Sequence, residues 1–63
     1  MITDETVDGV AQAFHERYER LAPEHSYETR KASAKPWSDV PENNKALMRA
    51  VVRSLLEDGV INA

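Results

Sequence analysis

The stretch from Trp37 to Met48 constrains the fold more than any other part of the sequence. It joins a large aromatic side chain to a helix-start signal and to the first turns of a helix with an apolar face. Asp39, followed three residues later by Glu42, resembles a capping box, and Pro41 is tolerated in the first turn of a helix. The sequence therefore predicts a helix that begins at residue 39 or 40, directly after an aromatic anchor of the core.

The length of 63 residues allows one domain, residues 1–63, and a chain of this length beginning at Met1 is typical of a complete small protein. The core of so small a domain seldom contributes more than about 3–5 kcal/mol, so cross-links or self-association usually supplement it. The chain has no cysteine, and His15 and His25 alone cannot complete a metal site. We therefore expect no metal or other cofactor, and we predict a homodimer.

The charge balance favours some partner classes over others. Acidic residues outnumber basic ones by 11 to 8, for a net charge of −3, whereas a nucleic-acid-binding domain is usually basic. The apolar runs are too short to cross a bilayer, and the N-terminal residues do not follow the pattern of a signal peptide. We expect a cytoplasmic protein that binds neither nucleic acid nor a membrane.

The first helix is predicted over residues 4–22. Thr3 is a suitable N-cap, and Pro23 limits the C-terminal end. Apolar side chains follow at the spacing of three and four that gives one helical stripe: Val7, Val10, Ala11, Phe14, Tyr18, Leu21 and Ala22. Gly9 costs about 1 kcal/mol relative to Ala inside a helix. Either the helix begins near Gly9, or another segment packs closely against its backbone.

The second helix is predicted over residues 40–58, with Gly59 closing it in a Schellman motif. Its apolar face is wider than one partner helix requires. We expect one stripe of this face to pack against the first helix: Leu47, Val51 and Leu55. The neighbouring stripe then forms either a patch for a protein partner or a surface that the loop covers: Met48, Val52 and Leu56.

A ridge of basic residues runs along the same helix at intervals of four: Lys45, Arg49 and Arg53. The ridge is either a solvated face or a contact for phosphates or an acidic partner. The predicted partner-binding residues are therefore Met48, Val52, Leu56, Arg49 and Arg53.

The connection over residues 23–38 is long for a pair of helices and contains two aromatic side chains, Tyr27 and Trp37. In one interpretation, both aromatics close the open end of a two-helix core. In the other, they join the loop cations in binding an anionic or nucleotide-like ligand by stacking and charge, through Tyr27, Arg30, Lys31, Lys35 and Trp37.

No group of residues predicts catalysis. His15 and Glu16 are adjacent on a helix and point in different directions, and no serine has a base beside it. A glycine-rich phosphate-binding loop is also absent from the sequence. We therefore expect that the chain is not an enzyme.

Four short segments carry a resemblance to a known family: Phe-His-Glu-Arg-Tyr at 14–18, Ser-Tyr-Glu at 26–28, Lys-Pro-Trp at 35–37 and Asp-Val-Pro-Glu-Asn-Asn-Lys at 39–45. In this order they resemble a shortened ryanodine-receptor repeat, and they are also similar to small proteins of actinobacterial bacteriophages. The chain departs from the repeat in lacking a glycine before Tyr27, in having Tyr18 where the repeat usually has Trp, and in its shorter loop. The resemblance implies an all-helical phage or bacterial accessory protein without catalytic residues.

The sequence as a whole predicts an all-α fold of two antiparallel helices joined by an aromatic-anchored loop. The predicted function is a non-catalytic protein-interaction module that binds itself and a host or assembly protein. The alternative function is small-ligand binding by the loop.

Overall fold

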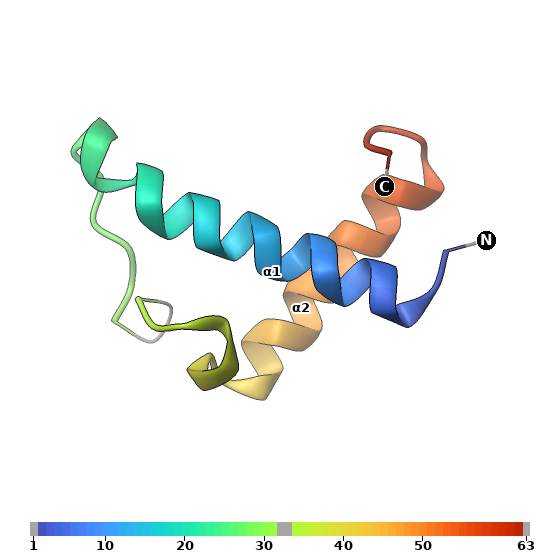
Figure 1. Cartoon of the computed structure of the whole chain (residues 1–63), viewed down its shortest axis with the longest axis horizontal. Coiled ribbons are helices and arrows are strands. Elements are labelled where there is room, and N and C mark those ends of the chain that lie inside the picture. Colours follow the sequence, from blue (N-terminus) through green and yellow to red (C-terminus); the bar gives the residue numbers. More distant parts are fainter. Residues whose placement is uncertain (1, 32–33, 63) are drawn as a thin grey trace.

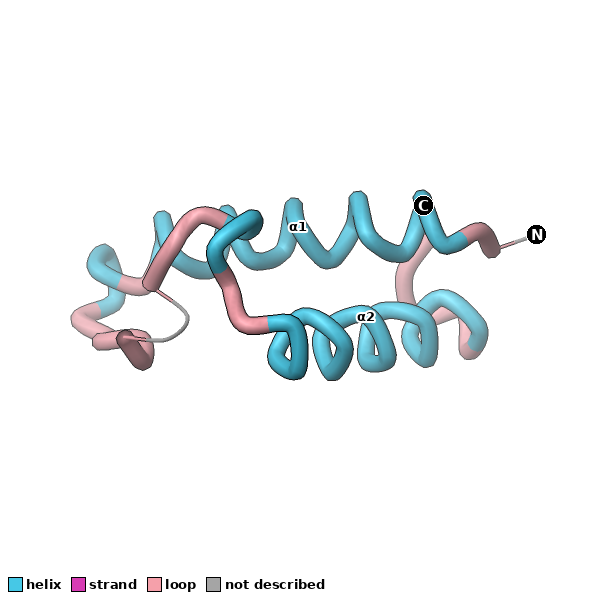
Figure 2. The backbone as a smooth tube through the Cα atoms, turned by 90° about the horizontal axis from the view of Figure 1, so that it is seen from below, coloured by secondary structure: helices cyan, strands magenta, loops and turns pink. Residues whose placement is uncertain are grey.

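The computed structural model describes residues 2–31 and 34–62, and its regular elements over these residues are all helical. Two α-helices, α1 (Asp4–Leu21) and α2 (Glu42–Glu57), are joined by two short 3-10 turns, η1 (Pro23–His25) and η2 (Trp37–Asp39). The helices lie in two stacked layers and cross at a steep angle over the N-terminal half of α1 (Figures 1 and 2). The predicted all-α helical hairpin is confirmed.

The start of α1 follows from its cap. Thr3 has an extended backbone, and its hydroxyl accepts a hydrogen bond from the Thr6 amide at 3.1 Å. Asp4 and Glu5 place negative charge in the first turn, where the helix dipole favours it. At the other end the helix stops at Leu21, and the observed bounds differ by one residue from the predicted range of 4–22.

Gly9 lies inside α1, and a Cβ atom added to it would meet nothing within 4 Å. Both interpretations offered for this glycine are therefore wrong: the helix does not begin there, and none of the described segments packs against it. The cap at Thr3 and the packing of the helix outweigh the local cost of the glycine.

The start of α2 differs from the prediction. Asp39 belongs to η2, and the amide of Val40 donates to the Trp37 carbonyl at 3.2 Å. The helix begins only at Glu42, with Pro41 as its N-cap and no side-chain cap. The predicted Asp39–Glu42 capping box is wrong because the residues before the proline form a turn of their own.

The end of α2 confirms the predicted Schellman motif. Gly59 has a φ of 70°, and its amide donates to the Leu56 carbonyl at 3.2 Å. The amide of Val60 donates to the Leu55 carbonyl at 3.0 Å. A left-handed residue at this position favours glycine.

A small core lies where the two helices cross. Its buried members are Val7, Ala11, Trp37, Val40 and Val52. Half-buried side chains pack around it: Ile2, Val10, Met48 and Leu56. The predicted role of Trp37 as an aromatic anchor is confirmed, because only 7% of this residue is exposed.

His15 holds the loop against α1. The residue is 5% exposed, and its Nε2 lies 2.6 Å from the backbone carbonyl oxygen of Lys35. A carbonyl oxygen can only accept, so Nε2 is the donor in this hydrogen bond. The His15 ring also lies 5.6 Å from the Trp37 ring, which fixes η2 beside the helix.

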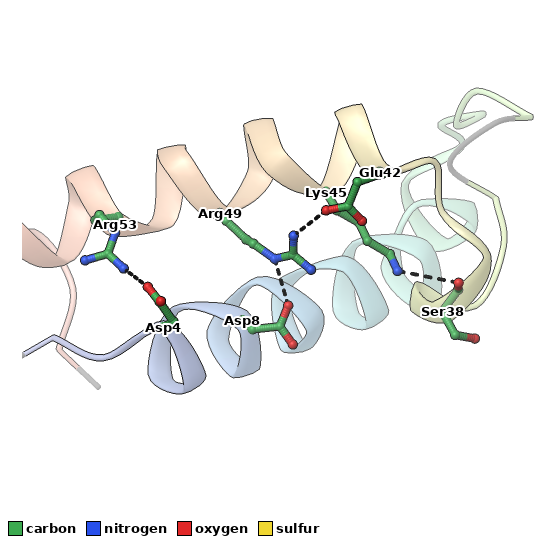
Figure 3. Close-up of polar contacts among 7 residues, drawn as sticks. All are labelled: Asp4, Asp8, Ser38, Glu42, Lys45, Arg49 and Arg53. Atoms are coloured by element: carbon green, nitrogen blue, oxygen red, sulfur yellow. Dashed lines mark hydrogen bonds and ion pairs between the residues drawn. The ribbon is translucent and has the colours of Figure 1, made fainter.

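Two ion pairs connect the helices (Figure 3). Arg49 pairs with Asp8 at 2.9 Å, and Arg53 pairs with Asp4. The two pairs step by four residues in opposite directions along the chain, as antiparallel helices require. Arg49 also contacts Glu42 at 2.9 Å within α2.

The apolar face of α2 is turned the other way from the prediction. Val52 is 3% exposed and packs in the core, whereas Leu47 and Val51 are 66% and 47% exposed. The two stripes have therefore exchanged roles: the Met48–Val52–Leu56 side of α2 packs against the core, and Arg49 and Arg53 pair with carboxylates of α1.

Candidate functional site

A groove of about 620 Å³ opens where the two helices diverge. Its walls come from the C-terminal half of α1, from residues 27–30 of the loop and from the first half of α2. Figure 1 shows this divergence, with the loop linking the separated ends of the helices. The apolar groove residues are Phe14, Tyr18, Tyr27, Leu47, Met48 and Val51.

Three aromatic rings form one continuous wall of the groove. Phe14 and Tyr18, one turn apart on α1, stack with ring centroids 5.9 Å apart. Tyr27 meets Tyr18 edge-on at 6.1 Å. Hydrogen bonding of the Tyr18 hydroxyl with Tyr27 raises the pKa of Tyr18 above its ordinary value of 10.0, and partial loss of water contact adds to this shift.

Backbone and side-chain contacts hold the loop wall in place. The amide of Tyr27 donates to the Ala22 carbonyl at 2.9 Å, and the Thr29 hydroxyl donates to the Glu19 carboxylate at 2.8 Å. Ser26, with a φ of 55°, makes the turn that brings Tyr27 back toward α1. The groove therefore has a defined shape.

The groove walls remain open to solvent. The exposed fractions are 51% for Phe14, 44% for Tyr18, 56% for Tyr27, 66% for Leu47 and 47% for Val51. Isolated exposed apolar side chains are normal on a protein surface, but a contiguous group of them marks an interaction site.

The charged residues that line the groove are one acidic and one basic side chain, Glu19 and Arg30. The groove is thus electrically balanced, although the whole chain carries a net charge of −3. Its other polar lining includes the buried His15, whose Nε2 is already bonded to the loop.

The structure separates the five predicted partner-binding residues. Met48 lines the groove, but Val52 is buried in the core and Leu56 packs half-buried against it. Arg49 and Arg53 are bonded to carboxylates of α1, Asp8 and Asp4. The hydrogen bonds of Arg49 with Asp8 and then with Glu42 of its own helix raise the pKa of the Arg49 guanidinium. The interpretation of Val52 as a surface residue is therefore wrong, because it lies on the inner side of α2.

The predicted ligand-binding set is also divided. Tyr27 and Arg30 line the groove together. Trp37 is buried, and its ring lies 5.5 Å from Lys45 Nζ and 5.9 Å from the Arg49 guanidinium, so it has no free face for a ligand. Lys31 and Lys35 are exposed and do not line the groove.

The comparisons with known proteins leave the groove as the main guide to function. No family model, curated protein or solved structure matches the chain. The resemblance to the ryanodine-receptor repeat and to small phage proteins stays a prediction. Among the described residues, no helix is long and apolar enough to cross a membrane, and no cluster of three or more His, Asp or Glu side chains is suited to a metal ion.

Four groove residues were assigned to the apolar stripes of the core by sequence reasoning: Phe14, Tyr18, Leu47 and Val51. Periodicity identifies an apolar stripe but does not say whether it meets a helix of the same chain. The signal that could have placed these residues is the charge spacing, because Asp4 and Asp8 match Arg53 and Arg49 on antiparallel helices.

Proposed function

We propose that the chain is a non-catalytic protein-interaction module whose binding surface is the groove between α1 and α2. The observation that carries the proposal is the group of five large apolar side chains, each 44% to 66% exposed, on the walls of one groove. Aromatic side chains are enriched at protein interfaces and supply much of the binding energy there.

The openness of the walls favours a protein over a small molecule. Pockets for small ligands usually bury about 70–90% of the ligand surface. A small molecule in this groove would lie among side chains that are themselves half exposed, whereas an apolar protein surface would cover them together. The resemblance to small phage proteins supports a host protein or an assembly factor as the partner.

Site-specific photo-crosslinking tests this proposal. The photoreactive residue p-benzoylphenylalanine, in place of Tyr18, should give discrete protein adducts on irradiation in cells. The same residue in place of Arg17, the exposed neighbour on α1 outside the groove, is the matched control. The absence of an adduct specific to position 18 would refute the proposed function.

Small-ligand binding is the second candidate, and the position of Tyr27 beside Arg30 on the groove favours it. A nucleotide or another anion would stack on the tyrosine and pair with the guanidinium. Such a ligand should raise the melting temperature of the wild-type chain and have no effect on an Arg30→Ala variant. A panel of nucleotides without effect on the wild type would remove this candidate.

A further inference from the structure

The chain exposes more surface than its mass predicts. Its accessible surface is 4843 Å². The usual scaling of surface with mass gives about 4,100 Å² for a folded monomer of 7.1 kDa. The excess of roughly 700 Å² is close to the surface, about 800 Å², that each partner covers in a standard protein interface.

The dimensions of the molecule agree with this excess. The Cα radius of gyration is 12.1 Å, compared with about 10.6 Å for a compact chain of this length. The shortest Cα dimension is 13 Å, because the molecule is only two helical layers thick (Figure 2). No large side chain among the described residues is fully buried. A second pair of helices would thicken the molecule and complete its core.

The groove has a shape that a second copy can match. Leu47 and Val51, one turn apart on α2, form an exposed apolar ridge along one edge of the groove. The aromatic wall of Phe14, Tyr18 and Tyr27 lies opposite. Because the ridge and the wall share one face, a two-fold axis can place the ridge of each copy against the wall of the other.

The charges of the groove permit this arrangement. An acidic chain would be repelled by an acidic groove, but Glu19 and Arg30 balance each other here. Each copy contributes one of these charges of each sign, so the two facing grooves of a dimer carry no net charge from them.

We infer that a second copy of this chain occupies the groove, in a two-fold four-helix dimer in which the Leu47–Val51 ridge of each copy packs on the aromatic wall of the other. This inference rests on the proposed function and specifies its first partner. The absence of cysteine from the sequence gives the test a clean background, because any thiol introduced is the only one in its chain.

Disulfide trapping between two single-cysteine variants tests the arrangement. Tyr18→Cys chains mixed with Leu47→Cys chains should form a cross-linked heterodimer under mild oxidation. Ala46→Cys is the matched control for Leu47→Cys, because Ala46 is exposed on α2 and lies outside the groove. Equal cross-linking by Ala46→Cys and Leu47→Cys would overturn the inference.

Sedimentation equilibrium gives an independent measurement that introduces no cysteine. The wild type and Ala46→Glu should sediment at twice the mass of 7.1 kDa, and Leu47→Glu should sediment as a monomer. A wild type that stays monomeric with full helicity at all concentrations would overturn the inference, even if Leu47→Glu fails to fold.

The two proposals can fail separately. If the wild-type chain sediments as a monomer and position 18 crosslinks to a different protein, the dimer inference is overturned. The protein-interaction function is then supported. A monomer without any adduct would overturn both.

Discussion

The replacement of Trp37 by alanine should unfold the protein. The side chain is 93% buried, as its 7% exposure shows, and it contacts both helices through the core. A buried tryptophan removes up to about 250 Å² from water. At about 25 cal/mol per Å² this burial is worth up to roughly 6 kcal/mol, an upper estimate because unfolded chains are already partly collapsed.

Measured tryptophan-to-alanine changes in protein cores cost about 3–5 kcal/mol, which agrees with this estimate. The core of so small a domain seldom contributes more than about 3–5 kcal/mol to stability. The variant therefore loses most or all of its folding free energy. The loss should include the contacts of the ring with His15 and with the Lys45 ammonium group.

Circular dichroism at 222 nm with urea titration measures the effect directly. Trp37→Ala should show little helix at 25 °C, and Trp37→Phe should fold with a lowered midpoint because it keeps part of the ring. Val60→Ala, at a 68% exposed position outside the groove, is the control for loss of apolar area without loss of the core. All chains are compared at several concentrations, since dimerisation would raise apparent stability. A Trp37→Ala variant with the wild-type midpoint would refute the assignment of this residue to the core.

Further predictions concern the backbone, the ion pairs and pH. Gly9→Ala should raise stability by about 1 kcal/mol in urea titration, because the position is helical and open, and an unchanged or lower midpoint would contradict this. Gly59→Ala should lower stability by about 1 kcal/mol, because the residue has a φ of 70° and a Cβ atom is strained there. Asp8→Arg and Arg49→Asp should each lower the melting temperature, and the double variant should recover part of the loss. If the loss in the double variant equals the sum of the two single losses, the pair does not couple the helices. The raised pKa of Tyr18 means that the folded state holds this proton more tightly. Its contribution to stability is complete below pH 10.0 and is lost as pH rises through the folded-state pKa, so a Tyr18→Phe variant should lack this alkaline step in a melting series.

Local signals predicted the elements of the fold well. The cap at Thr3, the proline after the first helix and the glycine after the second fix the helix ends to within one or two residues. Trp37 is the largest apolar side chain in the sequence, and its position just before α2 made its burial predictable. The start of α2 was less predictable, because the turn at η2 competes with the capping box for the same residues.

The candidate site was harder to predict, since it depends on how α2 is rotated. Leu47 and Val51 on one stripe and Met48 and Val52 on the next are about equally apolar, so hydrophobic periodicity cannot choose between them. The side chain of His15 gave no signal of its burial, because its partner is a backbone carbonyl far along the chain.

The placement of the two helix ends has a practical consequence. The N-terminal end of α1 and the C-terminal end of α2 lie at the same side of the molecule, where Arg53 meets Asp4 (Figures 1 and 3). The groove lies toward the opposite end, beside the loop. A tag, a surface attachment or a fused domain can therefore be joined at the terminal end of either helix without covering the groove. A chain attached to a surface at this end would leave its groove accessible to a second copy or to another protein.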